Sequence, residues 1–187
     1  MGKKEGQGKY TWADGSTYSG DWIDNRINGQ GVYLWKDGRK YYGEWLNNDM
    51  EGYGVYYWAD GRRYEGQYHN DKKCGFGLYH WTDGRKYEGW WYKGKQHGLG
   101  TYLDPAKEKV KFGLWEGGKR IKWFDEEGIQ QISRNQLDYT AFFTEPESRG
   151  TVKPNSSFYR PAGFDASLNS IKKKLNVPYE PNTGPLI

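Results

Sequence analysis

Rings and glycines alternate with polar residues along the first two thirds of the chain, and the pattern returns every 23 residues. Pairs of glycines with one residue between them stand at Gly6/Gly8, Gly29/Gly31, Gly52/Gly54, Gly75/Gly77 and Gly98/Gly100. Trp-x-Asp-Gly recurs from Trp12, Trp35, Trp58 and Trp81, and Tyr-x-Gly-x-aromatic recurs from Tyr18, Tyr41, Tyr64 and Tyr87. A period of two is the spacing of β-strands, and a constant longer period over several copies indicates a repeat array.

Each unit is predicted to be one β-hairpin that turns at Asp-Gly. A two-residue loop at Asp37 and Gly38 would put the rings of successive strands on opposite faces of the sheet. A three-residue loop over residues 36–38, with a left-handed Gly38, instead gives these pairs: Trp35 with Arg39, Tyr33 with Tyr41, and Gly31 with Gly43. We favour the three-residue loop, because it sets ring beside ring and leaves space over the glycines that large neighbouring rings can fill.

The predicted fold is therefore all-β: an elongated, single-layer antiparallel sheet of tandem 23-residue hairpins, with an irregular C-terminal arm that holds short helices. A fifth, degraded copy, Phe-Gly-Leu-Trp at residues 112–115, comes one residue late. All ten Trp lie at or before Trp123, where the composition changes. We expect a repeat array over residues 1–124 and an extended arm, bound to a partner, over residues 125–187.

The arm is expected to form two short helices, over residues 126–137 and 166–176, the second capped by Asp165. Neither is long enough to be stable alone. A solvating linker would not carry so many rings, so the arm is expected to become ordered on the surfaces of partner proteins. The rings predicted to make these contacts are Phe142, Phe143, Phe158, Tyr159 and Phe164.

A single-layer sheet cannot cover both of its faces, so an exposed stripe of rings is expected to meet a helix or strand from a partner, or the chain's own tail. The residues predicted to line this protein-binding groove are Tyr18, Trp22, Tyr33, Tyr41, Trp45, Tyr56, Tyr64, Tyr68, Tyr79, Tyr87 and Trp91.

Basic residues follow three successive Asp-Gly turns, and we expect them to form a ladder along one end of the hairpins. They are Arg39, Lys40, Arg62, Arg63, Arg85 and Lys86. Such a ladder could bind anionic lipid headgroups, at about 1 kcal/mol per basic residue near the membrane surface. Because Asp37, Asp60 and Asp83 stand beside them, a solvated edge that neutralises itself is the interpretation we favour.

Aromatic residues make up 18% of the chain, while the hydrophobic fraction is only 35%. The single Cys74 excludes a disulfide framework, and the first residues lack the apolar core of a signal peptide, so we expect a cytoplasmic protein. His69, His80 and His97 neither recur at the repeat period nor stand at metal-ligand spacing. The Gly-x-Gly pairs lack the third glycine of a nucleotide loop. We therefore expect no enzymatic activity, no metal, no cofactor and no nucleic-acid partner.

The pattern Tyr-x-Gly-x-Trp, a variable loop and Gly-x-Gly-x-Tyr-x-Trp-x-Asp-Gly resembles the MORN (membrane occupation and recognition nexus) repeat over residues 6–123. The resemblance implies an elongated hairpin array that binds other proteins of a large complex. Members of the family occur at membrane junctions, in cytoskeletal scaffolds and in the radial spokes of cilia and flagella. It favours a scaffold in a cytoskeletal assembly, within the family's range a ciliary or flagellar axoneme. The alternative is a peripheral membrane tether that binds anionic phospholipids.

Overall fold

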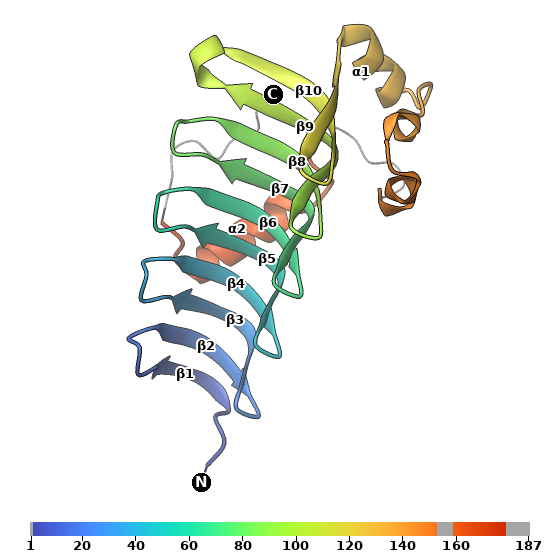
Figure 1. Cartoon of the computed structure of the whole chain (residues 1–187). Helices are drawn as coiled ribbons and strands as arrows, with labels where there is room; N and C mark the ends of the chain where they lie inside the picture. The colour runs from blue at the N-terminus through green and yellow to red at the C-terminus, as the bar shows by residue number, and fades with distance from the viewer. Residues whose placement is uncertain (1, 153–158, 179–187) are drawn as a thin grey trace.

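The computed structural model describes residues 2–152 and 159–178, in which eleven strands form one antiparallel sheet and each strand pairs with its neighbours in sequence. The hairpins stack along an elongated molecule, with the N-terminus at one end (Figure 1). The expected all-β repeat fold is confirmed. The strands are β1 (Gly6–Thr11), β2 (Thr17–Ile23), β3 (Arg26–Leu34), β4 (Lys40–Leu46), β5 (Asp49–Tyr57), β6 (Arg63–His69), β7 (Lys72–His80), β8 (Lys86–Tyr92), β9 (Lys95–Asp104), β10 (Lys109–Glu116) and β11 (Lys119–Phe124).

The Asp-Gly turns have the predicted three-residue register. Trp35 donates its backbone N–H to the carbonyl of Arg39 at 2.9 Å, and Tyr33 and Gly31 pair with Tyr41 and Gly43. The φ of Gly38 is +91°, which is the left-handed conformation that a residue with a side chain rarely adopts. The rings of successive strands therefore lie on one face of the sheet, here called the ring face.

The opposite ends of the hairpins are closed by two-residue turns whose central residues both have positive φ, as in type I′ turns. The side chain just ahead of a Gly-x-Gly pair supports the turn of the next hairpin. Asn28 accepts a hydrogen bond from the backbone N–H of Asn47 at 3.0 Å, and Glu51 accepts one from Asn70 at 3.1 Å. These bonds couple each hairpin to the one after it.

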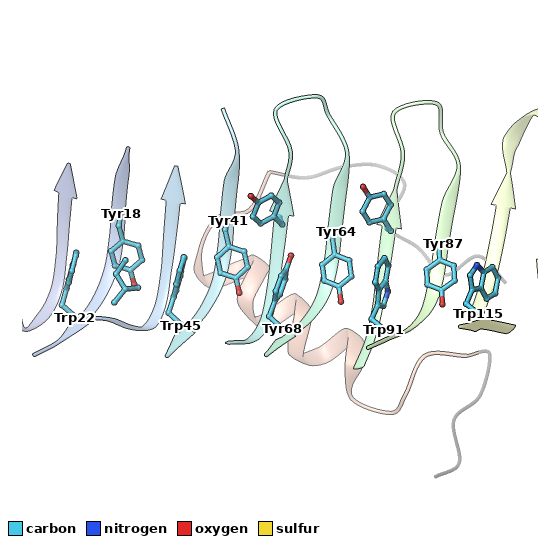
Figure 2. Packing of buried hydrophobic residues seen from close by; sticks show 12 residues of the cluster. Tyr18, Trp22, Tyr41, Trp45, Tyr64, Tyr68, Tyr87, Trp91 and Trp115 are labelled. Atoms are coloured by element: carbon cyan, nitrogen blue, oxygen red, sulfur yellow. The ribbon is translucent and has the colours of Figure 1, made fainter. Parts of the chain in front are cut away.

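Four tyrosines one repeat apart, Tyr18, Tyr41, Tyr64 and Tyr87, are completely buried on the ring face and lie in one row across the strands (Figure 2). Each covers a pair of opposed glycines. A Cβ on Gly66 would come within 2.6 Å of the Tyr64 hydroxyl and within 2.7 Å of the backbone of Gly77. The missing side chains of these glycines therefore leave room for the tyrosine rings, as predicted.

The first glycine of each Gly-x-Gly pair has a different role, which the sequence did not indicate. At Gly75, φ is +57° and the pairing of β6 with β7 shifts register after Gly66. The Gln67 side chain accepts a hydrogen bond from the N–H of Phe76 at 3.1 Å within this bulge. The first glycine permits the backbone to bulge, whereas the second makes room for a ring.

In the described residues, two α-helices follow the sheet, α1 (Glu126–Ser133) and α2 (Phe164–Lys174). The 3-10 helices η2 (Tyr139–Phe142) and η3 (Pro146–Thr151) lie between them, and η1 (Pro105–Lys107) connects β9 to β10. The Asp125 side chain caps α1 by accepting from the N–H of Gly128 at 2.9 Å. The predicted cap of α2 was wrong, because Gly163 stands at that position and Asp165 lies in the first turn. Asp165 instead forms an ion pair with Arg160.

The described part of the tail folds back on its own sheet, so the expectation of an extended arm was wrong, whereas binding of the arm to a partner stays a prediction. Helix α2 lies behind the middle of the sheet, on the face opposite the rings, here called the second face (Figures 1 and 2). Phe164 and Leu168 of α2 pack there against Val55, Phe76 and Leu78. The sheet is therefore covered by a second layer over part of its length.

Candidate protein-binding surfaces

Most of the residues predicted to line a protein-binding groove fill the core of the ring face. Ten of the eleven are at most 6% exposed: Tyr18, Trp22, Tyr41, Trp45, Tyr56, Tyr64, Tyr68, Tyr79, Tyr87 and Trp91. They pack edge-to-face across repeats, as Tyr64 does on Trp91 with ring centroids 5.2 Å apart. These rings stabilise the array and offer little area to a partner. Protein binding by them stays a prediction.

A second line of rings on the same face is more open. The outer ring row consists of Trp12, Tyr33, Trp35, Tyr56, Trp58, Tyr79, Trp81, Tyr102 and Trp123, in that order along the array. Successive centroids are 4.4 to 6.2 Å apart. All but Tyr56 and Tyr79 are only partly buried. Of this row, the sequence-based list included Tyr33, Tyr56 and Tyr79. It omitted Tyr102 and the tryptophans, although the Trp-x-Asp-Gly motif marks four of these, Trp12, Trp35, Trp58 and Trp81.

Three of the predicted basic residues are bound to this outer row. The Nε of Arg62 lies 2.7 Å from Asp60, its Nη1 donates to the Tyr79 hydroxyl at 3.3 Å, and its guanidinium lies over the ring of Trp58. Arg39 and Arg85 repeat this arrangement one repeat before and one repeat after. Each of these three arginines therefore has an aspartate beside it, as in the self-neutralising interpretation.

The other three basic residues lie on the second face, because successive strand residues point to opposite sides. Arg63 is 6% exposed and its Nε lies 2.9 Å from Glu65. Lys86 is partly buried, and burial together with Arg63 lowers the pKa of its amino group. Lys40 is exposed. The expectation of one basic ladder was therefore wrong, and lipid binding by the six residues stays a prediction.

Lys73 stands inside a cage of rings that the sequence analysis did not identify. Its Nζ lies 4.3 Å from the ring centroid of Trp91 and 4.8 Å from that of Tyr79, with Trp58 and Tyr64 slightly farther away. The same repeat position holds Ile27 and Met50 in the two preceding units. Burial, with a smaller contribution from Arg62, lowers the pKa of Lys73 to about 8. The ring faces partly compensate the buried charge.

We expect Lys73→Met to stabilise the array by about 2 kcal/mol at neutral pH, because methionine fills the cage without a charge. In the folded chain the Lys73 pKa of about 8 lies below the ordinary value of 10.5. Charged Lys73 therefore destabilises the fold below its folded pKa, and this effect fades as pH rises toward 10.5. Urea unfolding near pH 7 and about pH 9.5 would measure the gain in the free energy of unfolding. The gain should be smaller at the higher pH. A gain that is equal at both values would contradict this assignment.

Ion pairs hold the tail against the second face. Arg160 lies 2.5 Å from the carboxylate of Glu88, which is 5% exposed. Glu65, at 1% exposed, pairs with Lys172 of α2 as well as with Arg63. Burying these two carboxylates costs free energy unless cations lie beside them, and the tail supplies Arg160 and Lys172. The second face is therefore built to receive the segment from residue 160 onward.

The rings predicted as arm contacts have different environments. Phe143 is 5% exposed and stacks on His97 with centroids 5.1 Å apart, and Phe164 is 1% exposed. Phe142 and Tyr159 are 37% and 47% exposed, and Phe158 lies outside the described residues. Two of the five predicted partner contacts are thus buried within the chain itself, because the second face carries apolar side chains that need cover.

The histidines have local partners. His69 lies 2.8 Å from Glu51, and His97 accepts a hydrogen bond from the N–H of Gly117. Burial, reinforced by Arg63, lowers the pKa of His80 to about 3. Among residues 2–152 and 159–178, no three histidine, cysteine, aspartate or glutamate side chains are grouped so as to hold a metal ion. No helix in the same residues is long and apolar enough to cross a membrane.

The comparison with protein families bears on the repeats. The MORN repeat model matches five segments, residues 1–17, 18–38, 41–62, 64–84 and 87–106, which together make up more than half of the chain. The last four segments begin at the four completely buried tyrosines, Tyr18, Tyr41, Tyr64 and Tyr87. A search of curated proteins found no match.

Proposed function

Because the chain belongs to the MORN repeat family, we propose that it is a non-enzymatic scaffold whose outer ring row binds other proteins of a cytoskeletal assembly. MORN repeats bind proteins and membrane lipids. The observation that carries the proposal is a continuous row of nine rings on the ring face, seven of them partly exposed, while helix α2 packs on the other face. Tryptophan and tyrosine are enriched among the residues that contribute most to protein interfaces.

The assembly that we propose is a ciliary or flagellar axoneme in the cytoplasm. What supports it is membership of the MORN repeat family, some of whose members occur in radial spokes. The packing of the tail on its own sheet supports a rigid building block rather than a flexible adaptor, since tail residues contact side chains of β5, β7 and β8.

Removal of the outer tryptophans is expected to release the protein from its assembly. Trp35→Ala, Trp58→Ala and Trp81→Ala would be combined in tagged protein, and the ciliated cells extracted with detergent and high salt. The parent should remain insoluble and the variant should appear in the soluble fraction, because ring contacts persist in salt whereas exposed charge pairs are screened. Only variants that still melt cooperatively would be compared.

The matched control replaces three apolar residues that are exposed elsewhere, Ile23, Leu34 and Leu46, with alanine. It removes a similar kind of surface and should leave the protein insoluble. Equal retention of the parent and the tryptophan variant would contradict binding through the outer ring row. Release of the parent by detergent or salt alone would instead favour the membrane tether.

A further inference from the structure

The aspartate–arginine pair of the hairpin turns is replaced in the fifth repeat. In the three preceding repeats, an aspartate of the turn lies 2.7 Å from the arginine that follows it. The fifth turn is replaced by a longer segment that contains η1 and carries Lys107, Lys109 and Lys111 together with Asp104 and Glu108. Asp104 lies 3.3 Å from Lys107, whose side chain is nonetheless 69% exposed. The cations at this end of the array therefore outnumber the carboxylates, with Arg85, Lys107, Lys109, Lys111 and Arg120 against Asp83, Asp104 and Glu108.

These lysines border a cavity of about 460 Å³, here called the cap pocket. Five cationic side chains and one carboxylate are among its nine lining residues: Arg85, Tyr102, Asp104, Lys107, Lys109, Lys111, Trp115, Arg120 and Trp123. The volume lies within the usual range of ligand sites. Tyr102, Trp115 and Trp123 form its apolar part, so the pocket combines positive charge with aromatic surface.

Two of the cations lie over the ring of Trp123. The guanidinium of Arg120 lies 4.6 Å from the ring centroid of Trp123, and Lys111 lies 5.3 Å from the same ring. A flat aromatic ligand would have to displace them from Trp123, whereas an anion would find them already assembled. The arrangement therefore favours an anionic group that enters the pocket with a short apolar stem.

We propose that the cap pocket binds an acidic peptide segment of a partner protein, with carboxylates held by the lysines of the fifth turn. This inference rests on the proposed scaffold function and names the chemistry of one partner contact. A peptide fits better than a membrane surface, because the cations border a hollow. The large apolar side chains that are most exposed, among them Ile23 and Leu46, lie outside its lining, so none is placed to enter a bilayer beside it.

The test measures fluorescence anisotropy of a labelled peptide of about eight glutamates, with a serine-glycine peptide of equal length as reference. The full chain should bind the glutamate peptide, and Lys107→Gln, Lys109→Gln and Lys111→Gln together should weaken binding by about tenfold or more. The matched control, Lys72→Gln, Lys93→Gln and Lys95→Gln, changes the net charge equally at sites outside the pocket lining. It should weaken binding by less than about twofold.

Equal weakening by the two sets of substitutions would overturn the proposal, since it would show general attraction by net charge. It would also be overturned if vesicles containing phosphoinositides bound the chain through these lysines and the peptide did not. Failure of the peptide to bind leaves the proposed scaffold function separately testable, because the outer tryptophan variants retain all three lysines of the cap pocket.

Discussion

Gly66→Ala is expected to lower the free energy of unfolding of the array by about 3 kcal/mol, although it adds only one methyl group. The added Cβ would lie 2.6 Å from the Tyr64 hydroxyl, 2.7 Å from the Cα of Gly77 and 2.8 Å from the carbonyl oxygen of Phe76. Rotation of the tyrosine could relieve the first contact, but the other two are with backbone of the neighbouring strand. Either β6 and β7 must separate, or the fully buried ring must leave its place.

The control is Gly8→Ala on the edge strand β1, at the repeat position of Gly77, the glycine that pairs with Gly66. No earlier repeat supplies a tyrosine over Gly8, and a Cβ there would meet only Trp22, at an ordinary contact distance of 3.6 Å. Urea unfolding followed by near-ultraviolet circular dichroism would report both variants. We expect the control to change the free energy of unfolding by less than about 0.5 kcal/mol. Equal effects of the two substitutions would contradict the packing of tyrosine over glycine.

The repeat architecture could be predicted because its determinants are local. The register of Asp37 and Gly38 depends on the few residues around one turn, and the same turn recurs in each unit. The alternation of rings and glycines specifies which face they share. The turns at the opposite ends of the hairpins are also marked in the sequence. Asn47-Asn48 and Asn70-Asp71 are residues that tolerate positive φ, as a type I′ turn requires.

The candidate binding surface was harder to predict, because burial depends on contacts between distant repeats. The sequence showed that Tyr41 and Tyr64 share a face, but whether they are exposed depends on how the next repeat packs over them. The basic residues could have been divided between faces by the same period of two, had it been applied to the pair after each turn. Arg62 and Arg63 are adjacent, so one faces Trp58 and the other faces Glu65.

The position of the tail lay beyond local pattern altogether. Arg160 and Glu88 are 72 residues apart in sequence, and each is an ordinary charged residue in its own segment. Leu168 and Ile171 give α2 an apolar face, yet nothing nearby in sequence indicated what would cover it. Phe76 and Leu78 were available on the second face, and the hydrophobic effect brings the two surfaces together.

Phe164→Ala is accordingly expected to detach α2 from the sheet. The Phe164 ring is 1% exposed and lies against Phe76 and Tyr53, with centroids 5.2 and 5.9 Å away. Its removal should weaken docking by about 3 to 4 kcal/mol. A helix of 11 residues is marginal on its own, so it should unfold once released, while the backbone hydrogen bonds of the sheet remain.

Amide hydrogen exchange separates this local event from global unfolding. In Phe164→Ala, amides of α2 should exchange about a hundredfold faster or more, while those of the inner strands β4 to β6 change far less, because the sheet does not depend on the helix for its hydrogen bonds. Tyr159→Ala, which removes a ring that is 47% exposed in the same tail, should leave α2 protected. If α2 stayed equally protected in Phe164→Ala, the apolar contact would be dispensable, and the ion pairs of Arg160 and Lys172 would have to hold the tail by themselves.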